Sequence, residues 1–373
     1  MKKILHIPNY YPPHIGGIED VCHSIVAGLP EYHHRVICFN DKKKDETDVV
    51  EGITVTRCGN IKKLFSQSLS VSFYPQLKKL FAEFQPDIVH FHTPNPLGSV
   101  YLLSLIPKNV KLIVHWHSDI VEQGFLYTFY HPIEKKLLRR ADKIFVTSPM
   151  YADGSKPLSH WKNKLHVIPN TVNVQKLTLE KEDAHEIEKI RNHYNGKKII
   201  FTFGRHVPYK GLSYLIDAIP KLSPNCVVVI AGKGPLTKRL KKMSNAPNLF
   251  FIGKLHESEL RRYLYASSIF AFPSITRNEA FGIALAEAMY CGLPAVTFTI
   301  PASGVNWVCI DKETGLESEN GNSKKLAGAI NRLLKDTELR DTLSANASER
   351  VRKFFVIEAI KEDLVQVYDE LSK

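Results

Sequence analysis

The sequence has 373 residues, of which 44% are hydrophobic and 24% charged, and it carries a formal net charge of +12. This length predicts about two domains that each bury a core, and the composition excludes a fibrous or disordered chain. No window offers the roughly 20 apolar residues that a membrane-spanning helix needs. The N-terminus is expected to be a strand and not a signal peptide. Six scattered cysteines without a CxxC pair are typical of a reducing, cytoplasmic compartment.

The excess of basic residues is spread over both halves of the chain and does not form a tail. It fits phosphate-bearing ligands or an anionic membrane surface, and it fits ordinary solvated basic faces equally well. We expect no nucleic-acid partner.

Short apolar runs alternate with helical patterns along the whole chain. Because the runs are continuous and not alternating, they predict parallel strands buried on both faces under helices. This pattern occurs twice and predicts an α/β protein of two doubly wound, Rossmann-like domains. The predicted strands of the first half are 3–8, 35–39, 53–57, 87–92, 111–117, 143–148 and 165–169. Those of the second half are 198–204, 226–232, 248–253, 268–274 and 294–299.

The boundary is predicted at the turn Pro169-Asn170, which leads into a charged stretch. The predicted organisation is an N-terminal domain over 1–170, a linker region over 171–195, a C-terminal domain over 196–354 and an amphipathic C-terminal helix within 355–373. Ligands of doubly wound sheets bind at the carboxyl ends of the strands. We therefore expect the site in a cleft between the two domains.

The first predicted strand leads into Gly16 and Gly17, which precede a helix beginning at Ile18. A glycine pair between strand and helix lets the backbone approach a ligand at an anion-favouring helix N-terminus. The signal is weak, because a plain tight turn has the same sequence.

The loops after three strands of the second half carry glycines and cations. Arg205 follows Gly204 at the end of strand 198–204, and Lys210 opens the next helix. An arginine fork and a lysine point charge facing a helix N-terminus predict a diphosphate site. The loop at Gly232 and the loop that ends in Lys254 and Leu255 follow the next two strands. We expect both loops to line the same sheet edge.

Glu279 and Glu287 have seven residues between them, in the sequence PSITRNEAFGIALAEAMYCGLPAV. Glu287 lies in an otherwise apolar helix, where a carboxylate needs a partner. Glu279 precedes that helix, in a loop after a strand. Two carboxylates at a strand–loop–helix junction predict a polyol site. A carboxylate satisfied by backbone amides remains the alternative.

Two HxH pairs end neighbouring strands: His90 with His92, and His115 with His117. Alternate residues share one face of a strand, so each pair could chelate a metal ion. A metal-dependent hydrolase is the alternative function that this pattern raises, with Asp119 as the local carboxylate. Core or sugar-binding histidines are the simpler interpretation.

Taken together, the motifs resemble those of glycosyltransferase family 4, the retaining sugar-nucleotide transferases of the GT-B fold. The resemblance covers essentially the whole chain and looks closest to bacterial mannosyl- and rhamnosyltransferase-like enzymes of surface polysaccharide synthesis. It rests on PPHIGGIE (12–19), VHWHSDI (114–120), FGRHVPYKG (203–211), AGKGPL (231–236), FPSITRNEAFGIALAEAMYCGLPAV (272–296) and ETGL (313–316).

The resemblance implies a role for each matching residue. The catalytic positions it implies are His117, near the sugar, with Arg205, Lys210 and Glu279. Glu279 would bind sugar hydroxyls and Glu287 the ribose, and the C-terminal helix would pack back on the N-terminal domain. The donor-binding positions it implies are Gly16, Gly17, Gly204, Arg205, Lys210, Gly232, Lys254, Leu255, Glu279, Phe281, Gly282, Ile283 and Glu287.

The prediction for the whole chain is therefore a retaining hexosyltransferase. It uses a GDP- or UDP-linked sugar as donor, with mannose favoured, and a glycan or lipid-linked acceptor, without a metal or other cofactor. Residues 61–84 and 131–140 interleave lysine and arginine with apolar residues. These segments raise an anionic membrane surface as a further partner of a cytoplasmic, peripheral enzyme. A non-catalytic sugar-nucleotide-binding protein is the remaining alternative.

Overall fold

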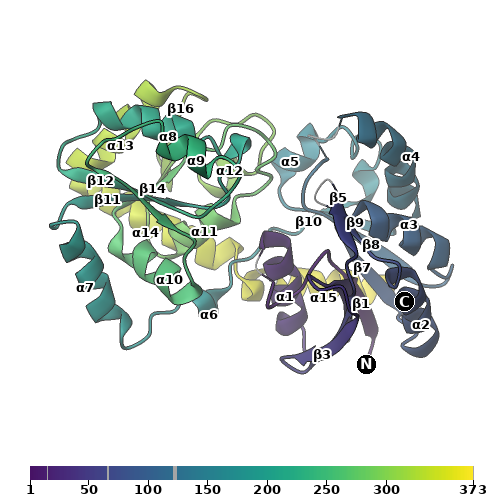
Figure 1. Cartoon of the computed structure of the whole chain (residues 1–373). Coiled ribbons are helices and arrows are strands. Elements are labelled where there is room, and N and C mark those ends of the chain that lie inside the picture. Colours follow the sequence, from purple (N-terminus) through teal and green to yellow (C-terminus); the bar gives the residue numbers. More distant parts are fainter. Residues whose placement is uncertain (15, 65–66, 121–123, 373) are drawn as a thin grey trace. The chain divides into compact units, whose positions relative to one another are not determined.

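The computed structural model describes residues 1–14, 16–64, 67–120 and 124–372, and it divides into two compact units. Unit 1 comprises residues 1–171 together with 357–373, and unit 2 comprises residues 172–356. Each unit is a sheet of mainly parallel strands covered by helices on both faces (Figure 1). The predicted architecture of two doubly wound α/β domains is confirmed.

The sheet of unit 1 has eight strands in the order β10-β9-β8-β7-β1-β2-β4-β3. Neighbouring strands are parallel except for β3, which runs antiparallel to β4. The strands are β1 (Lys3–Ile7), β2 (His33–Phe39), β3 (Glu46–Val50), β4 (Ile53–Cys58), β7 (Ile88–Thr93), β8 (Lys111–Trp116), β9 (Lys143–Val146) and β10 (Leu165–Val167). A separate hairpin pairs β5 (Lys62–Leu64) with β6 (Gln67–Leu69).

Helices cover both faces of this sheet. In Figure 1, α1 and α15 lie on one side of it, and α2 and α3 on the other. The helices of unit 1 are α1 (Gly17–Gly28), α2 (Phe73–Glu83), α3 (Pro96–Leu105), α4 (Gly124–Arg140), α5 (Pro149–Gly154) and α15 (Ile357–Leu371). Helix α15 packs on α1 at Gly28, where a side chain would overlap Ile357. The C-terminal helix therefore belongs to the unit formed by the N-terminal residues.

The sheet of unit 2 has six parallel strands in the order β13-β12-β11-β14-β15-β16. They are β11 (Lys198–Phe203), β12 (Cys226–Ala231), β13 (Leu249–Gly253), β14 (Ile269–Phe272), β15 (Ala295–Phe298) and β16 (Gly315–Ser318). The helices are α6 (Val174–Leu177), α7 (Asp183–His193), α8 (Leu212–Ala218), α9 (Thr237–Lys241), α10 (Glu257–Ala266), α11 (Ile283–Tyr290), α12 (Val305–Val308), α13 (Ser323–Lys335) and α14 (Thr337–Phe354).

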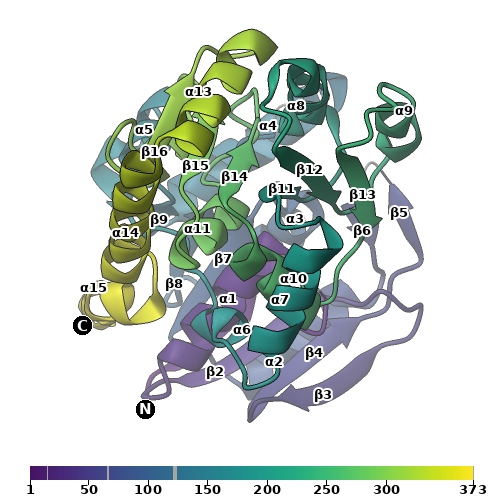
Figure 2. The ribbon, with the colours of Figure 1, turned by 90° about the vertical axis from the view of Figure 1, so that its left-hand side faces the viewer.

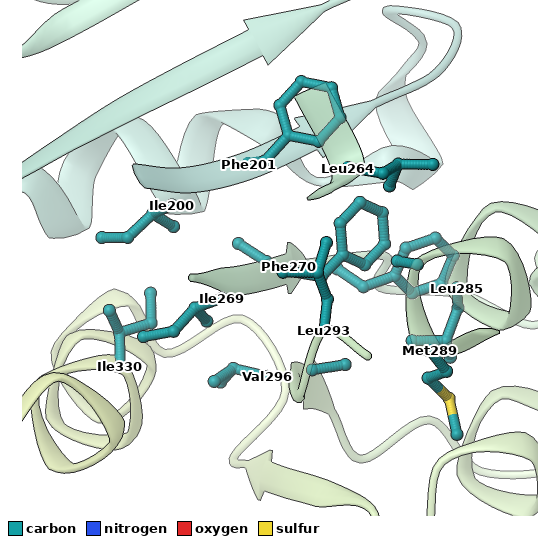
Figure 3. Packing of buried hydrophobic residues seen from close by; sticks show 14 of the residues in the cluster. Ile200, Phe201, Leu264, Ile269, Phe270, Leu285, Met289, Leu293, Val296 and Ile330 are labelled. Atoms are coloured by element: carbon teal, nitrogen blue, oxygen red, sulfur yellow. The ribbon is translucent and has the colours of Figure 1, made fainter. Parts of the chain in front are cut away.

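The core of unit 2 follows from the alternation of side chains along its strands. Phe201 and Phe270 point towards α10 and α11, whereas Ile200 and Ile269 point to the opposite face, where Ile330 of α13 packs (Figure 3). All five side chains are fully buried. Because both faces of each strand are apolar, the strands read as continuous hydrophobic runs, as parallel sheets do.

Residues 172–195, nearly all of the predicted linker 171–195, are folded into unit 2. They form α6 and α7, and α7 runs beside α10 (Figure 2). Asp183, at the start of α7, is fully buried and forms 2.7 Å ion pairs with Arg261 and Arg262 of α10. The charged residues that led to the linker prediction include Asp183, which anchors this segment to α10.

The basic segment 61–84 is not one amphipathic stretch. It is divided between the β5–β6 hairpin and α2, which buries Phe73, Leu77 and Leu80. Lys78 and Lys79 lie on the exposed side of α2. Among the described residues, no helix is long and apolar enough to cross a membrane.

Candidate active site

The site of unit 2 is built on the carboxyl ends of β11, β12 and β13, where three loops pack backbone against backbone. The Gly232 amide donates to the Gly253 carbonyl, and a Cβ at Gly232 would overlap the Gly204 carbonyl oxygen. Gly204, Gly232 and Gly253 have φ values of 145°, 108° and 80°. Such conformations favour glycine, so the sequence sets the close approach of these loops.

Lys210 lies directly over the Gly204 backbone. A Cβ at Gly204 would stand 3.7 Å from the Lys210 Cε and 3.9 Å from its Nζ. The ammonium also lies 5.0 Å from the centroid of the Phe272 ring. Lys210 ends a short 3-10 turn (Pro208–Lys210), and Gly211 follows with a φ of 58°. A side chain at Gly211 would overlap the Pro273 carbonyl, so this glycine lets the loops after β11 and β14 meet.

Glu279 is the partner of Lys210. The Lys210 ammonium donates to the Glu279 carboxylate at 2.5 Å, and the Ser274 hydroxyl donates to the same oxygen at 3.1 Å. Burial alone would lower the pKa of Lys210, but the adjacent Glu279 carboxylate outweighs it and raises the pKa. The pair therefore holds a charged ammonium in place beside the strand ends.

Arg205 differs from Lys210 in its surroundings. Its side chain is exposed, and among the described residues it has no hydrogen bond or ion pair. It is close enough to act electrostatically on Lys210, where its positive charge works to lower the lysine pKa. Two cations at one strand end, one of them without a partner in the described chain, form a favourable position for an anion.

These residues surround a small depression that opens to solvent and has an empty volume of about 220 Å³. Its lining contains several of the residues that the sequence singled out. The lining residues are Thr202, Phe203, Gly204, Arg205, Lys210, Leu212, Phe272, Pro273 and Ser274.

Gly282 caps α11 with a φ of 90°, and Phe281 is buried beside it. Ile283 begins the helix, and Glu287 lies one turn further on. Glu287 is half-buried, so the helix does not enclose it as the apolar sequence around it suggested. Its apolar neighbours Leu285 and Met289 face the core (Figure 3).

Lys254 and Leu255 follow β13 directly. Lys254 is exposed and Leu255 half-buried. A Cβ at Gly253 would lie 3.7 Å from the Lys233 Cε, which brings the loop after β12 against this one. The predicted donor-side residues of unit 2, except Glu287 within α11, thus lie on loops or helix starts that follow its strands.

The remaining predicted residues, Gly16, Gly17 and His117, belong to unit 1. Gly16 precedes α1 in an extended conformation, and a Cβ there would overlap the Glu19 carboxylate. Glu19 is 8% exposed, and burial raises the pKa of its carboxyl. The sequence motif contained Glu19, but sequence reasoning gave it no role.

His117 directly follows β8 and is 5% exposed. Its Nε2 lies 3.0 Å from the Nδ1 of His92, and burial lowers the pKa of His117 to about 3. His90 and His115 are likewise joined, Nε2 to Nδ1, at 3.2 Å. The two HxH pairs are therefore linked across β7 and β8 by hydrogen bonds between neutral imidazoles.

The hydrolase alternative requires a carboxylate beside these histidines. Asp119 is instead held by Trp116 and Ser155, whose Nε1 and Oγ donate to its Oδ1 at 2.8 Å and 2.7 Å. Among the described residues, the side-chain groups with metal-binding spacing contain histidine and cysteine but no carboxylate. In the part of the chain that the structure describes, no carboxylate stands at these groups to act as the base of metal-assisted hydrolysis.

Sequence reasoning missed the residues that position the predicted ones. Ser274 bonds the Glu279 carboxylate, and Ser303 donates to the Glu279 carbonyl at 2.5 Å. The backbone carbonyl of Tyr209 accepts a hydrogen bond from the amide of Ile275, and this bond joins the loop after β14 to the loop after β11. Ser303 and Glu279 are 24 residues apart, and Ile275 lies still further from Tyr209, so these pairings leave no local signal.

Two family models together match most of the chain. The family model of Glycosyltransferase Family 4 matches residues 15–176, and that of Glycosyl transferases group 1 matches residues 183–350. O-antigen chain mannosyltransferase C of Escherichia coli is 28% identical, over 99% of this chain and 98% of that protein. D-rhamnosyltransferase WbpZ of Pseudomonas aeruginosa is 29% identical, over 95% and 92%.

Solved structures share the fold at low sequence identity. HepE of Anabaena, in complex with UDP-glucose, has a TM-score of 0.80 at 19% identity, covering 99% of this chain and all of that one. Sucrose-phosphate synthase from Thermosynechococcus elongatus has a TM-score of 0.79 at 20% identity, covering 100% and 99%. The two family models and the shared fold show that the chain belongs to the glycosyltransferases of the group 1 and family 4 type, with the GT-B fold.

Proposed function

We propose that this glycosyltransferase is a retaining, metal-independent hexosyltransferase that uses a nucleotide diphosphate sugar. The observation that carries the proposal is the pair of cations at the end of β11. Lys210 is fixed over the Gly204 backbone by Glu279, and Arg205 is exposed beside it. This arrangement suits a diphosphate, whose negative charge increases as the bond to the sugar breaks.

The proposed mechanism assigns the leaving group to unit 2. Carbon–oxygen cleavage produces an oxocarbenium-like sugar and a diphosphate leaving group. Arg205 and Lys210 stabilise the diphosphate charge, which removes the need for a divalent cation. Glu279 would bind sugar hydroxyls, and Glu287 would bind the ribose. The leaving phosphate would take the proton of the acceptor hydroxyl on the same face of the sugar, so that the anomeric configuration is retained.

Unit 1 would supply the acceptor side. His117 is proposed to contact the sugar at the reaction centre, and the loop at Gly16 and Gly17 to contact phosphate or acceptor. The two relatives named above are described as a mannosyltransferase and a rhamnosyltransferase, and the Anabaena structure contains UDP-glucose. We therefore propose a GDP- or UDP-linked hexose, with mannose favoured, and a glycan or lipid-linked acceptor.

A panel of nucleotide sugars tests the proposal. The protein is incubated with each donor, and release of the nucleoside diphosphate is followed with and without excess EDTA. We expect release from at least one GDP- or UDP-hexose and no loss of rate with EDTA. If none of the donors is turned over, the result would favour the non-catalytic sugar-nucleotide-binding protein. Complete inactivation by EDTA, reversed by an added divalent ion, would contradict the metal-independent mechanism.

The lipid-linked acceptor implies contact with a cytoplasmic membrane surface. Lys78 and Lys79 are exposed on α2, and Phe129 on α4 is 66% exposed. Each cation near an anionic surface contributes on the order of 1 kcal/mol. We expect the protein to sediment with vesicles rich in anionic lipid, less at high salt, and less when both lysines become glutamate. Lys324→Glu with Lys325→Glu, on α13, is the matched control. No sedimentation at low salt would remove the membrane from the proposal.

A further inference from the structure

Six buried histidines gather on one face of the unit 1 sheet: His6, His34, His90, His92, His115 and His117. Neighbouring strands bring them together, since His6 is in register with His90 and His92 with His115. The face is the one covered by α1 and α15, because Tyr368 of α15 bonds His90 at 2.6 Å. The glycosyltransferase proposal uses only His117, so the other histidines need a separate explanation.

His6 presents a lone pair to the interior. The Nε2 of His34 bonds the Leu29 carbonyl at 2.8 Å, so that nitrogen carries the proton. The other His34 nitrogen then accepts from the His6 Nε2, at 3.1 Å. Burial lowers the pKa of both histidines, which are therefore neutral. A neutral His6 protonated at Nε2 leaves Nδ1 as a bare acceptor, and this atom has no hydrogen-bond partner in the described chain.

His92 and Cys22 converge on the same position. The Nδ1 of His92 bonds His117, while its Nε2 is buried and without a hydrogen-bond partner among the described residues. Cys22 reaches the sheet from α1 and is fully buried. One donor atom each from His6, Cys22 and His92 lies within 4.8 Å of the others. Unsatisfied nitrogens are costly in a dry interior, so their convergence beside a thiol calls for a ligand.

We propose that His6, Cys22 and His92 bind a zinc ion in the interior of unit 1. Two imidazoles and a thiolate are preferred zinc ligands, with bonds of about 2.0–2.3 Å. Binding releases the Cys22 thiol proton to solvent, and the thiolate offsets one of the two positive charges. His6 already has the second hydrogen bond that orients a metal-ligating imidazole, to His34.

A second group, His90, His92 and His115, has similar spacing but is a weaker candidate. Both nitrogens of His90 are already engaged, with Tyr368 and His115. That group would have to break a hydrogen bond of His90 to take a metal ion, whereas the group containing Cys22 would break none of the bonds described above.

The site has a consequence for His117 that rests on the proposed function. Zinc on the Nε2 of His92 leaves the proton on its Nδ1, which then donates to the Nε2 of His117. The His117 proton is thereby fixed on Nδ1. His92 would be a positioning residue that determines which nitrogen of His117 can donate a hydrogen bond.

Metal content of the untagged full-length chain tests the site without any substrate. The protein is produced with added zinc, purified without chelator and measured by mass spectrometry of the metal. Cys22→Ser removes the thiolate, and Cys58→Ser is the matched control, because Cys58 is also a buried thiol of unit 1 but lies outside both groups. We expect about one zinc per chain in the wild type and in Cys58→Ser, and at least about 100-fold weaker binding in Cys22→Ser.

Cobalt replaces zinc in a second measurement that needs no variant to fold. Coordination by Cys22 would give a thiolate-to-cobalt charge-transfer band in the near ultraviolet for the wild-type protein. The inference is overturned if the wild type takes up no metal after loading, if cobalt gives no thiolate band, or if Cys22→Ser binds zinc as tightly as the wild type. Failure of the proposed function would leave the zinc content unchanged, since neither measurement involves a nucleotide sugar.

Discussion

The two sheets of this glycosyltransferase differ in where they hold polar groups. In unit 2, which the structure describes completely, the buried strand positions are apolar except for three hydroxyls, those of Thr202, Thr297 and Ser318. The charged residues within its strands, Lys198 and Glu317, are not fully buried, and the other charged groups stand at strand ends and on the covering helices. In unit 1, buried imidazoles lie within β1, β2, β7 and β8. One doubly wound topology thus supports two kinds of interior.

The difference shows that a parallel sheet can bury polar side chains that bond one another, although the histidines of this face keep four nitrogens without a partner among the described residues. Burial lowers the pKa of His90 to about 3 and that of His92 well below its ordinary value, so both are neutral at physiological pH. Neutral imidazoles can pair as donor and acceptor without a charge to desolvate. Unit 2 restricts charges to places where they meet solvent or each other. Five predictions test this contrast, from the largest expected free-energy change to the smallest.

Asp183 is the most deeply buried charge of unit 2. Asp183→Asn leaves Arg261, which is 3% exposed, with only the exposed Glu180 as a carboxylate partner, and should lower the free energy of unfolding by about 3–5 kcal/mol. Glu186→Gln, an exposed change on the same helix, should leave the stability unchanged within error. Denaturant titration of the three proteins measures this. Equal stability of Asp183→Asn and wild type would show that α7 is held by apolar packing alone.

The same residue gives a pH dependence with a defined sign. Burial would raise the pKa of Asp183, but its bonds to Arg261 and the Glu180 amide outweigh this and lower the pKa from 3.8 to about 2. Because the folded-state pKa is depressed, the stabilisation is present above about pH 4 and is lost as the pH falls towards 2. The stability difference between wild type and Asp183→Asn should shrink over that interval.

Removing a cation at the end of β11 should have the next largest effect. Arg205→Ala or Lys210→Ala should reduce turnover by about 10²–10³-fold, as loss of one preorganised electrostatic donor does. Lys242→Ala, an exposed change beyond α9, is the control and should retain normal turnover. The measurement is steady-state release of the nucleoside diphosphate. Near-normal rates in both site variants would contradict the proposal that the diphosphate binds at this strand end.

Variants of the two carboxylates, Glu279 and Glu287, should differ in their affinity for the nucleotide. Glu287→Ala should weaken binding of the free nucleoside diphosphate by about 10–100-fold, since it loses charge-assisted hydrogen bonds to the ribose. Glu279→Gln should bind the nucleotide nearly as well but turn over the sugar nucleotide slowly, because sugar contacts and the grip on Lys210 are impaired. Calorimetry with the nucleotide and kinetics with the donor distinguish them. Equal affinities in both variants would contradict this division of roles.

Much of the fold could be predicted because its signals are local. Each predicted strand range overlaps an observed strand, since buried parallel strands are short apolar segments. The glycines of the unit 2 loops were recognisable for the same reason, as the positive φ of Gly232 and Gly253 constrains the residue type at one position. The exposed edge strand β3 escaped prediction because its burial alternates and leaves no apolar run.

The pairings inside the site could not be predicted, because they depend on strand order. Lys210 and Glu279 are 69 residues apart and meet only because β11 and β14 are neighbours. The HxH pairs were visible in the sequence. That His6 and Cys22 join His92 follows only from the order β7-β1-β2 and from α1 covering that face. The amphipathic pattern predicted helix α15, but it could not predict that Tyr368 of this helix bonds His90.

Tyr368→Phe tests the unit 1 interior with the smallest change. Its hydroxyl bonds the Nδ1 of His90, and both side chains are fully buried. The variant leaves that nitrogen unsatisfied and should cost about 1–3 kcal/mol of unfolding free energy. Tyr32→Phe is the matched control, because its hydroxyl bonds Asp369, whose side chain is 51% exposed, so water can replace the lost bond. If both variants lose an equally small free energy of unfolding, the buried histidines tolerate an unpaired nitrogen. The hydrogen bonds among them would then not be what stabilises this sheet.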